Sequence, residues 1–102
     1  MDIIWLPLAE EALGNIYRFY MEKSQQAARR IISDILESTQ RLSDYPEIAP
    51  IEQILDNHPI IFRSLVIRKT YKVVYYAEGN IIYIADVWDC RQNPESLRNR
   101  IN

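Results

Sequence analysis

The stretch FRSLVIRKTYKVVYYAEGNIIYIADVW, residues 62–88, decides the fold. It contains three runs rich in Val, Ile, Tyr and Trp, at residues 62–67, 71–77 and 81–88, and this composition is typical of β-strands. Three residues separate each run from the next, and the second separator contains Gly79, which suits a tight turn. The stretch therefore predicts three antiparallel strands joined by hairpins, which need an apolar cover on one face.

Alternation along the middle strand separates its side chains into two sets. Tyr71 and Tyr75 fall on one face, and Lys72 and Tyr76 fall on the other. We therefore expect one set to lie in the core and the other set to be exposed.

The residues before this stretch supply the cover. Residues 2–5 (DIIW) predict one short strand, and Pro7 suits the first turn of a helix. Apolar residues then recur every three or four positions to about residues 22–23, and again, after Ser24 as the N-cap, to about residues 45–46. Because the join is very short, we expect an antiparallel pair of helices.

The remaining segments complete an α+β fold. Residues 46–61 hold three prolines and predict a loop with one helical turn at 51–55, and residues 94–101 predict a short last helix. The order is β-α-α-β-β-β(-α), with a helix hairpin packed on a small, mainly antiparallel twisted sheet. With 102 residues of which 48% are hydrophobic, we expect one domain over residues 1–102.

Composition argues against several classes of protein. The N-terminus has an acidic residue at position 2 and no basic region, so it does not read as a secretory signal, and no run approaches the roughly 18 apolar residues of a membrane span. The single cysteine, Cys90, cannot form an internal disulfide, which suits a reducing cytoplasm. One Cys and one His do not supply an ordinary zinc site. We expect a cytoplasmic protein without a metal or a cofactor.

Charge is distributed unevenly along the chain. Residues 1–59 hold ten acidic and five basic side chains, a net charge of −5, whereas residues 60–102 hold four and seven, a net charge of +3. In the second part Arg63, Arg68, Lys69 and Lys72 follow one another with no acid between them. This cluster is either the solvated edge of a sheet or a surface for an anionic partner.

Element order and several stretches resemble the RelE/ParE superfamily of toxins from bacterial type II toxin-antitoxin systems, the plasmid stabilisation protein family. Residues 3–28 resemble the opening strand and first helix of the family. LSDYPEIAP (42–50) resembles the loop after its second helix, and residues 62–94 resemble its three-strand run with a terminal arginine. The resemblance covers nearly the whole chain and implies a toxin that inhibits growth and is neutralised by a cognate antitoxin.

The resemblance also implies roles for three basic residues. In the members that cut messenger RNA on the ribosome, basic groups on the sheet hold the scissile phosphate and stabilise charge in the transition state. Strand by strand, Arg63, Lys72 and Arg91 match such positions, and the Arg91 guanidinium can clamp a phosphate or a carboxylate. We expect these cations to converge in space. Pairing of Arg91 with Asp86 or Asp89 is the structural alternative.

The sequence departs from the RNA-cutting members in ways that keep the target open. Leu65 stands where a second catalytic Lys is expected, no Tyr or His follows Arg91, and the pI is near 5.3. His58 reads as a surface or loop-packing residue, and Glu47 or Glu52 acting as a base is a minor alternative. ParE-like members instead bind DNA gyrase without nuclease residues. Both targets, gyrase and ribosome-bound mRNA, stay open, and so does the question of enzymatic activity.

Partner binding is expected at Arg68, Lys69 and Trp88, although for Trp88 the alternative is that it packs on the helix hairpin or covers a groove. An acidic, amphipathic antitoxin segment would cover the basic sheet surface or the groove of the helix hairpin. A second function class also stays open, namely a non-toxic or decayed protein-binding module on the same scaffold.

Overall fold

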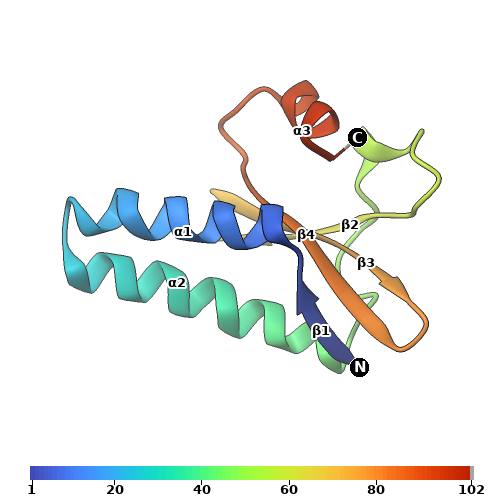
Figure 1. The fold of residues 1–102 in the computed structure, drawn as a ribbon, viewed down its shortest axis with the longest axis horizontal. Helices are drawn as coiled ribbons and strands as arrows, with labels where there is room; N and C mark the ends of the chain where they lie inside the picture. Colours follow the sequence, from blue (N-terminus) through green and yellow to red (C-terminus); the bar gives the residue numbers. More distant parts are fainter. Residues whose placement is uncertain (102) are drawn as a thin grey trace.

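The computed structural model describes residues 1–101 and confirms the predicted α+β order (Figure 1). Two short 3₁₀ helices, η1 and η2, lie between the helix hairpin and the three-strand run. The elements are β1 (Asp2–Trp5), α1 (Pro7–Met21), α2 (Gln25–Gln40), η1 (Arg41–Ser43), η2 (Gln53–Leu55), β2 (Arg63–Ile67), β3 (Tyr71–Glu78), β4 (Ile81–Asp89) and α3 (Pro94–Ile101).

The four strands form one mixed sheet in the order β1-β4-β3-β2. β2, β3 and β4 are antiparallel neighbours, as predicted, whereas β1 lies parallel to β4. β1 ends with Trp5 opposite Ile84, and the Leu6 N–H still donates to the Ile84 carbonyl at 3.0 Å before α1 begins. The last residues of β4 therefore extend beyond β1, and α1 borders the edge of the sheet there.

The helix pair covers one face of the sheet (Figure 1). Ser24 caps α2 as predicted, since its Oγ accepts a hydrogen bond from the Ala27 N–H at 3.2 Å. α2 ends at Gln40, earlier than predicted, because the chain tightens into η1. No helix among residues 1–101 has the length and apolar character to cross a bilayer. The buried set on this side, called the helix-face core, includes Ala9, Ile16, Ile31, Ile35, Tyr71, Val73, Tyr75, Ile82, Ile84 and Val87.

The opposite face of the sheet is also covered, which corrects the expectation that it would be exposed. α3 and the long loop with η2 pack on it, because Leu97 and Phe62 find apolar partners on β3 and β4. Trp88 is only 4% exposed and lies in this layer, so its expected packing on the helix hairpin is wrong. The set, called the α3-face core, comprises Leu55, Phe62, Val74, Ala85, Trp88 and Leu97.

A β-bulge in β4 decides which residues meet α3. Val74 lies opposite Asp86 and Tyr75 lies opposite Ile84, so Ala85 is an extra residue on β4. Ala85 packs in the α3-face core, and the Asp86 carboxylate binds Arg100 of α3. The bulge therefore places two consecutive side chains on the same side of the sheet.

The two hairpin turns differ in their backbone chemistry. The β3–β4 turn has Gly79 at a φ of 62°, as the sequence predicted. The β2–β3 turn instead places Arg68 and Lys69 at φ values of 55° and 59°, a left-handed conformation that non-glycine residues seldom adopt. The Thr70 N–H closes this turn on the Ile67 carbonyl at 3.2 Å.

Candidate functional site

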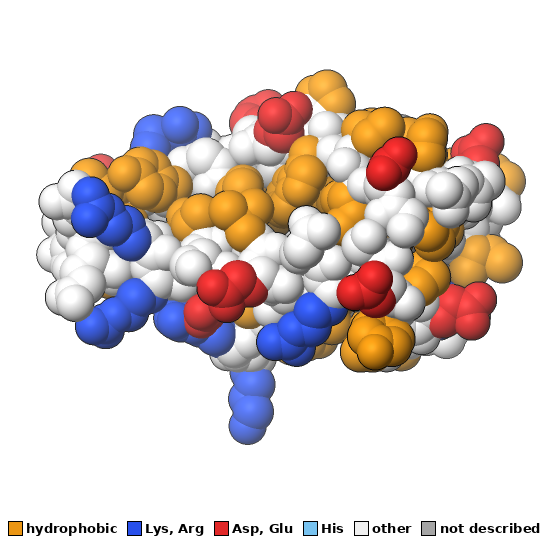
Figure 2. All heavy atoms as spheres, turned by 90° about the horizontal axis from the view of Figure 1, so that it is seen from below, with side chains coloured by type: hydrophobic (Ala, Val, Ile, Leu, Met, Phe, Trp, Pro, Cys, Tyr) orange, Lys and Arg blue, Asp and Glu red, His pale blue; other side chains and the backbone are white. Residues whose placement is uncertain are grey.

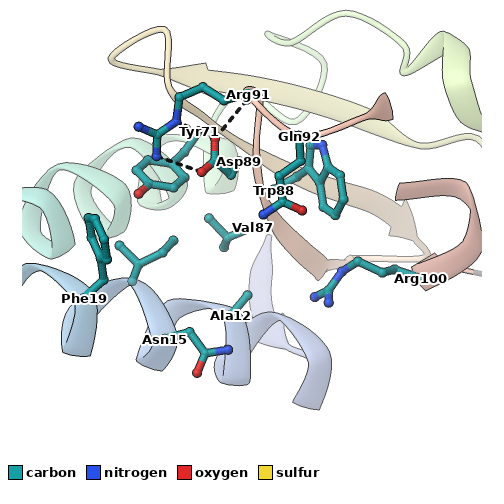
Figure 3. A pocket seen from close by; sticks show the side chains of 11 residues that line it. Ala12, Asn15, Phe19, Tyr71, Val87, Trp88, Asp89, Arg91, Gln92 and Arg100 are labelled. Carbon is teal, nitrogen blue, oxygen red and sulfur yellow. Dashed lines mark hydrogen bonds and ion pairs between the residues drawn. The ribbon is translucent and has the colours of Figure 1, made fainter. Parts of the chain in front are cut away.

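A cleft of about 240 Å³ opens where α1 runs beside the end of β4 (Figure 3). The residues that follow the apolar part of β4, including the predicted site residue Arg91, form one wall, and α1 forms the other. In Figure 3, Arg91 with Asp89 lies toward one side of the cleft and Arg100 lies toward the other. The full lining comprises Ala12, Asn15, Ile16, Phe19, Tyr71, Val87, Trp88, Asp89, Arg91, Gln92 and Arg100.

Arg91 is paired with Asp89, as the structural alternative predicted. Its Nε donates to Asp89 Oδ1 at 2.9 Å and its Nη2 donates to Oδ2 at 2.8 Å, while the Arg91 N–H also donates to Oδ1 at 2.9 Å. The hydrogen bonds from Arg91 lower the pKa of Asp89, and the same pairing raises the pKa of Arg91. The Arg91 side chain is nevertheless 65% exposed, so its guanidinium can contact a partner without leaving Asp89.

Aromatic groups flank this pair, and they are poorly suited to proton transfer. Tyr71 is buried, and burial together with the neighbouring Tyr20 raises the pKa of its phenol. Phe19 is exposed at the rim of the cleft. Since the carboxylate is held by a guanidinium and the phenol stays protonated near neutral pH, this end of the cleft can bind a partner but has no evident general base.

The second ion pair of the cleft was not predicted. Asp86 is fully buried, and its carboxylate accepts from Arg100 Nε at 2.9 Å, Arg100 Nη2 at 3.0 Å and the Val87 N–H at 2.8 Å. Hydrogen bonding to Asp86 raises the pKa of Arg100, whose guanidinium also lies 5.8 Å from the centre of the Trp88 ring. The expected pairing of Asp86 with Arg91 is therefore wrong. An Asp inside an otherwise apolar strand indicates a cationic partner, but the sequence does not say which cation it is.

Lys72 lies on the α3 face, away from Arg91. Its ammonium contacts the Glu52 carboxylate, which also accepts from Ser64 Oγ at 2.8 Å and the Ile54 N–H at 3.2 Å. Burial raises the pKa of Glu52, but the hydrogen bonds from Lys72, Ser64 and Ile54 outweigh burial, so the net pKa is lowered. With side chains 17% and 10% exposed, Lys72 and Glu52 form a largely enclosed pair.

Arg63 lies apart from both other predicted site residues. Its Nη1 donates to the Ala49 carbonyl at 2.8 Å, and it pairs with Tyr75 across the β2–β3 ladder, whereas Lys72 pairs with Val66 toward the other end. The expected convergence of Arg63, Lys72 and Arg91 is therefore not found. Strand pairing separates Arg63 from Lys72 along the ladder, and side-chain alternation places Lys72 and Tyr71, the partner of Asp89, on opposite faces.

The β2–β3 turn brings other cations toward Arg91. The Cys90 N–H donates to the Thr70 carbonyl at 2.7 Å, which holds the Arg91 segment against the turn that carries Arg68 and Lys69. Both of these side chains are exposed, and Arg68 Nε donates to Asp34 of α2 at 2.5 Å. Of the residues predicted to bind partners, Arg68 and Lys69 lie on the surface and Trp88 does not.

An apolar groove of about 470 Å³ runs along the outer side of the helix hairpin, beside β1. Figure 2 shows hydrophobic side chains spread along the length of this part of the molecule. Leu36 and Tyr17 are large apolar residues that line the groove and stay exposed. Its lining comprises Trp5, Glu10, Leu13, Gly14, Tyr17, Arg18, Ile32 and Leu36. Within residues 1–101, no three His, Cys, Asp or Glu side chains gather in a way that could hold a metal ion.

Comparison with known proteins places the chain in a family and finds solved structures of similar fold. A protein family described as the ParE toxin of type II toxin-antitoxin system, parDE, matches residues 3–94, and this match stops where α3 begins. A solved structure of the chromosomal ParDE TA system from P. aeruginosa is similar with a TM-score of 0.72 and 20% identity, over 87% of this chain and 95% of that chain. At this identity the likeness shows the fold. No curated protein matches the sequence.

Proposed function

Because the chain belongs to the ParE toxin family of type II toxin-antitoxin systems, we propose that it inhibits growth by binding DNA gyrase and not by cutting messenger RNA. The separation of Arg63, Lys72 and Arg91 carries this proposal. An RNA-cutting site needs several cations around one phosphate together with an acid and a base. Here Lys72 is neutralised by Glu52, and Arg63 is held by the Ala49 carbonyl.

The chemistry of the cleft supports the same proposal. Asp89 is held by Arg91, Asp86 is held by Arg100, and the Tyr71 phenol has a raised pKa. Groups in these states are poor proton acceptors for a ribose hydroxyl near neutral pH. An exposed guanidinium beside aromatic side chains is instead suited to contact with a protein partner.

Two assays on the purified chain test the target. We expect inhibition of gyrase supercoiling and intact messenger RNA in a ribosome-dependent cleavage assay. Cleavage without gyrase inhibition would reverse the assignment. Unaltered growth when the chain is expressed to high soluble levels without an antitoxin would favour the alternative of a non-toxic binding module.

Substitution of Arg91 tests the role of the cleft. Arg91→Ala should relieve gyrase inhibition by about tenfold or more, the size of effect found at interface hot spots. Arg41→Ala serves as the matched control, because Arg41 is an exposed arginine of η1 outside the cleft. Equal inhibition by the wild type and Arg91→Ala would remove Arg91 from the proposal.

We further propose that the partner is a cognate ParD-type antitoxin and that an amphipathic helix of this antitoxin occupies the groove of the helix hairpin. Exposed apolar surface of this kind is typical of interaction sites, and a groove between two helices accommodates the apolar face of a third. Leu36 is 44% exposed in the groove, so its substitution should not disturb the core.

The groove is tested by introducing a charge into it. Leu36→Glu should abolish co-purification with the antitoxin while leaving gyrase inhibition unchanged, because an unpaired carboxylate would be buried in the complex. Gln26→Glu is the control, since it adds the same charge at an exposed position of the same helix. A complex that tolerates Leu36→Glu would place the antitoxin elsewhere.

A further inference from the structure

The β2–β3 turn combines backbone strain with positive charge. Its two central residues, Arg68 and Lys69, both adopt positive φ, although Asn-Gly is the pair that takes such a turn with the least strain. Residues held in sparsely populated backbone regions concentrate at functional sites. The two strained residues are also the two cations of the turn. The strain therefore falls on residues whose side chains can bind an anion.

Three exposed cations lie at this end of the sheet. Arg68 and Lys69 lie on the turn, and the hydrogen bond from Cys90 to Thr70 holds the Arg91 segment beside it. Two carboxylates pair with them, since Arg68 binds Asp34 and Arg91 binds Asp89. Three cations against two acids give this region a charge of +1, and Lys69 forms no ion pair among the described residues.

We propose that Arg68 and Lys69, called the cationic tip, hold the phosphate backbone of duplex DNA, while Arg91 beside them keeps its proposed contact with gyrase. Lys and Arg side chains are among those that contact phosphates, and both of these side chains are exposed on the turn. The turn residues Arg68, Lys69 and Thr70 include no apolar side chain that could anchor a protein partner, so the composition favours a phosphate contact.

DNA gyrase binds DNA, so contact of the cationic tip with DNA would add to the proposed inhibition of gyrase. This inference rests on the proposed function only in assuming that the contact occurs on DNA bound to gyrase. A toxin that touches both gyrase and the DNA would need no reaction of its own to hold the two together. The contact with DNA itself can be measured without gyrase. The two proposals can therefore fail separately.

The experiment separates the charge of the turn from its fold. Arg68→Asn combined with Lys69→Gly removes both cations and supplies the pair that suits the turn, so this variant should unfold at a higher temperature than the wild type. In fluorescence anisotropy with a short labelled duplex at low salt, its DNA affinity should fall about tenfold, and the salt dependence of log K should weaken by up to about 2.

The matched control is Arg29→Gln combined with Arg41→Gln, which removes two exposed cations, one on α2 and one on η1. We expect this control to keep most of the affinity and the salt dependence of the wild type. The proposal is overturned if the wild type does not bind the duplex at low salt, if the turn variant binds as tightly as the wild type, or if both double variants lose affinity equally.

Gyrase and antitoxin assays on the same variants distinguish the remaining cases. If the wild type binds DNA through the cationic tip but does not inhibit gyrase, the DNA contact is supported and the proposed function is wrong. A turn variant that keeps DNA binding but loses its gyrase or antitoxin complex would show that the turn contacts protein, and this would overturn the assignment to DNA.

Discussion

The two faces of the sheet are closed by different physical means. On the helix face, α1 and α2 bury a periodic set of apolar side chains against β3 and β4. On the α3 face, an eight-residue helix and a long loop are fastened by two ion pairs with buried carboxylates, Arg100 with Asp86 and Lys72 with Glu52. One face depends on apolar area, and the other depends on individual polar contacts.

This difference predicts different responses to mutation. Apolar burial is non-directional and is spread over many contacts, so it degrades gradually when side chains are trimmed. A buried ion pair contributes little net stability while it is intact, but removal of one partner leaves an uncompensated charge. Single substitutions of polar residues on the α3 face should therefore lower the stability by more than the loss of apolar contact area would predict.

The largest effect is expected from truncation in the helix-face core. Ile35→Ala should lower the free energy of unfolding by about 4 kcal/mol, because Ile35 is fully buried in the global core. Leu97→Ala should cost less, about 3 kcal/mol, since local detachment of α3 while the rest stays folded limits the loss. Urea denaturation measures both values, and equal losses would mean that α3 belongs to the same cooperative unit as the helix hairpin.

The next effect concerns the buried carboxylate of the α3 face. Arg100→Ala should cost about 3 kcal/mol, because it leaves Asp86 buried with only the Val87 N–H as a partner. Asn99→Ala is the control on the same helix, because Asn99 is exposed. If thermal unfolding gave similar losses for the two variants, the α3 face would not depend on this ion pair.

A smaller effect is expected at the enclosed Lys72–Glu52 pair. Glu52→Gln should cost about 2 kcal/mol near neutral pH, through weaker hydrogen bonds to Lys72 and Ser64. Because the folded state lowers the pKa of Glu52 below 4.5, this contribution is present above that pH and is lost as the pH falls through the folded value. Urea titrations between neutral and acidic pH should therefore show the wild type and the variant approaching one another, and a constant difference would contradict the assignment.

The smallest effect on stability is expected for Arg91→Ala. The Arg91 side chain is 65% exposed and Asp89 keeps contact with solvent, so loss of the pair should leave the thermal midpoint unchanged within experimental scatter. Any loss of toxicity in this variant would then reflect contact with a partner and not unfolding. A large drop in the thermal midpoint would instead show that Arg91 stabilises the fold.

Local sequence patterns predicted most of the fold. The strand at residues 2–5 and the helix at residues 94–101 lie where the sequence placed them, and Ser24 and Gly79 serve as the predicted cap and turn residue. Such features depend on residues that are close along the chain, so residue type and spacing are sufficient to predict them. The packing of the long loop and α3 on the second face of the sheet was not predicted, because neither segment has the regular apolar spacing that identifies a buried face.

Local patterns along the chain were sufficient to predict the order of the elements, the apolar stripes of the helix pair and the candidate cations. The folded chain was needed to show which cations lie together and which are neutralised, and to reveal the pairing of Glu52 with Lys72 and of Asp86 with Arg100. The reason is that periodicity is a property of a segment, whereas strand pairing, the bulge at Ala85 and the docking of α3 join residues that are remote along the chain.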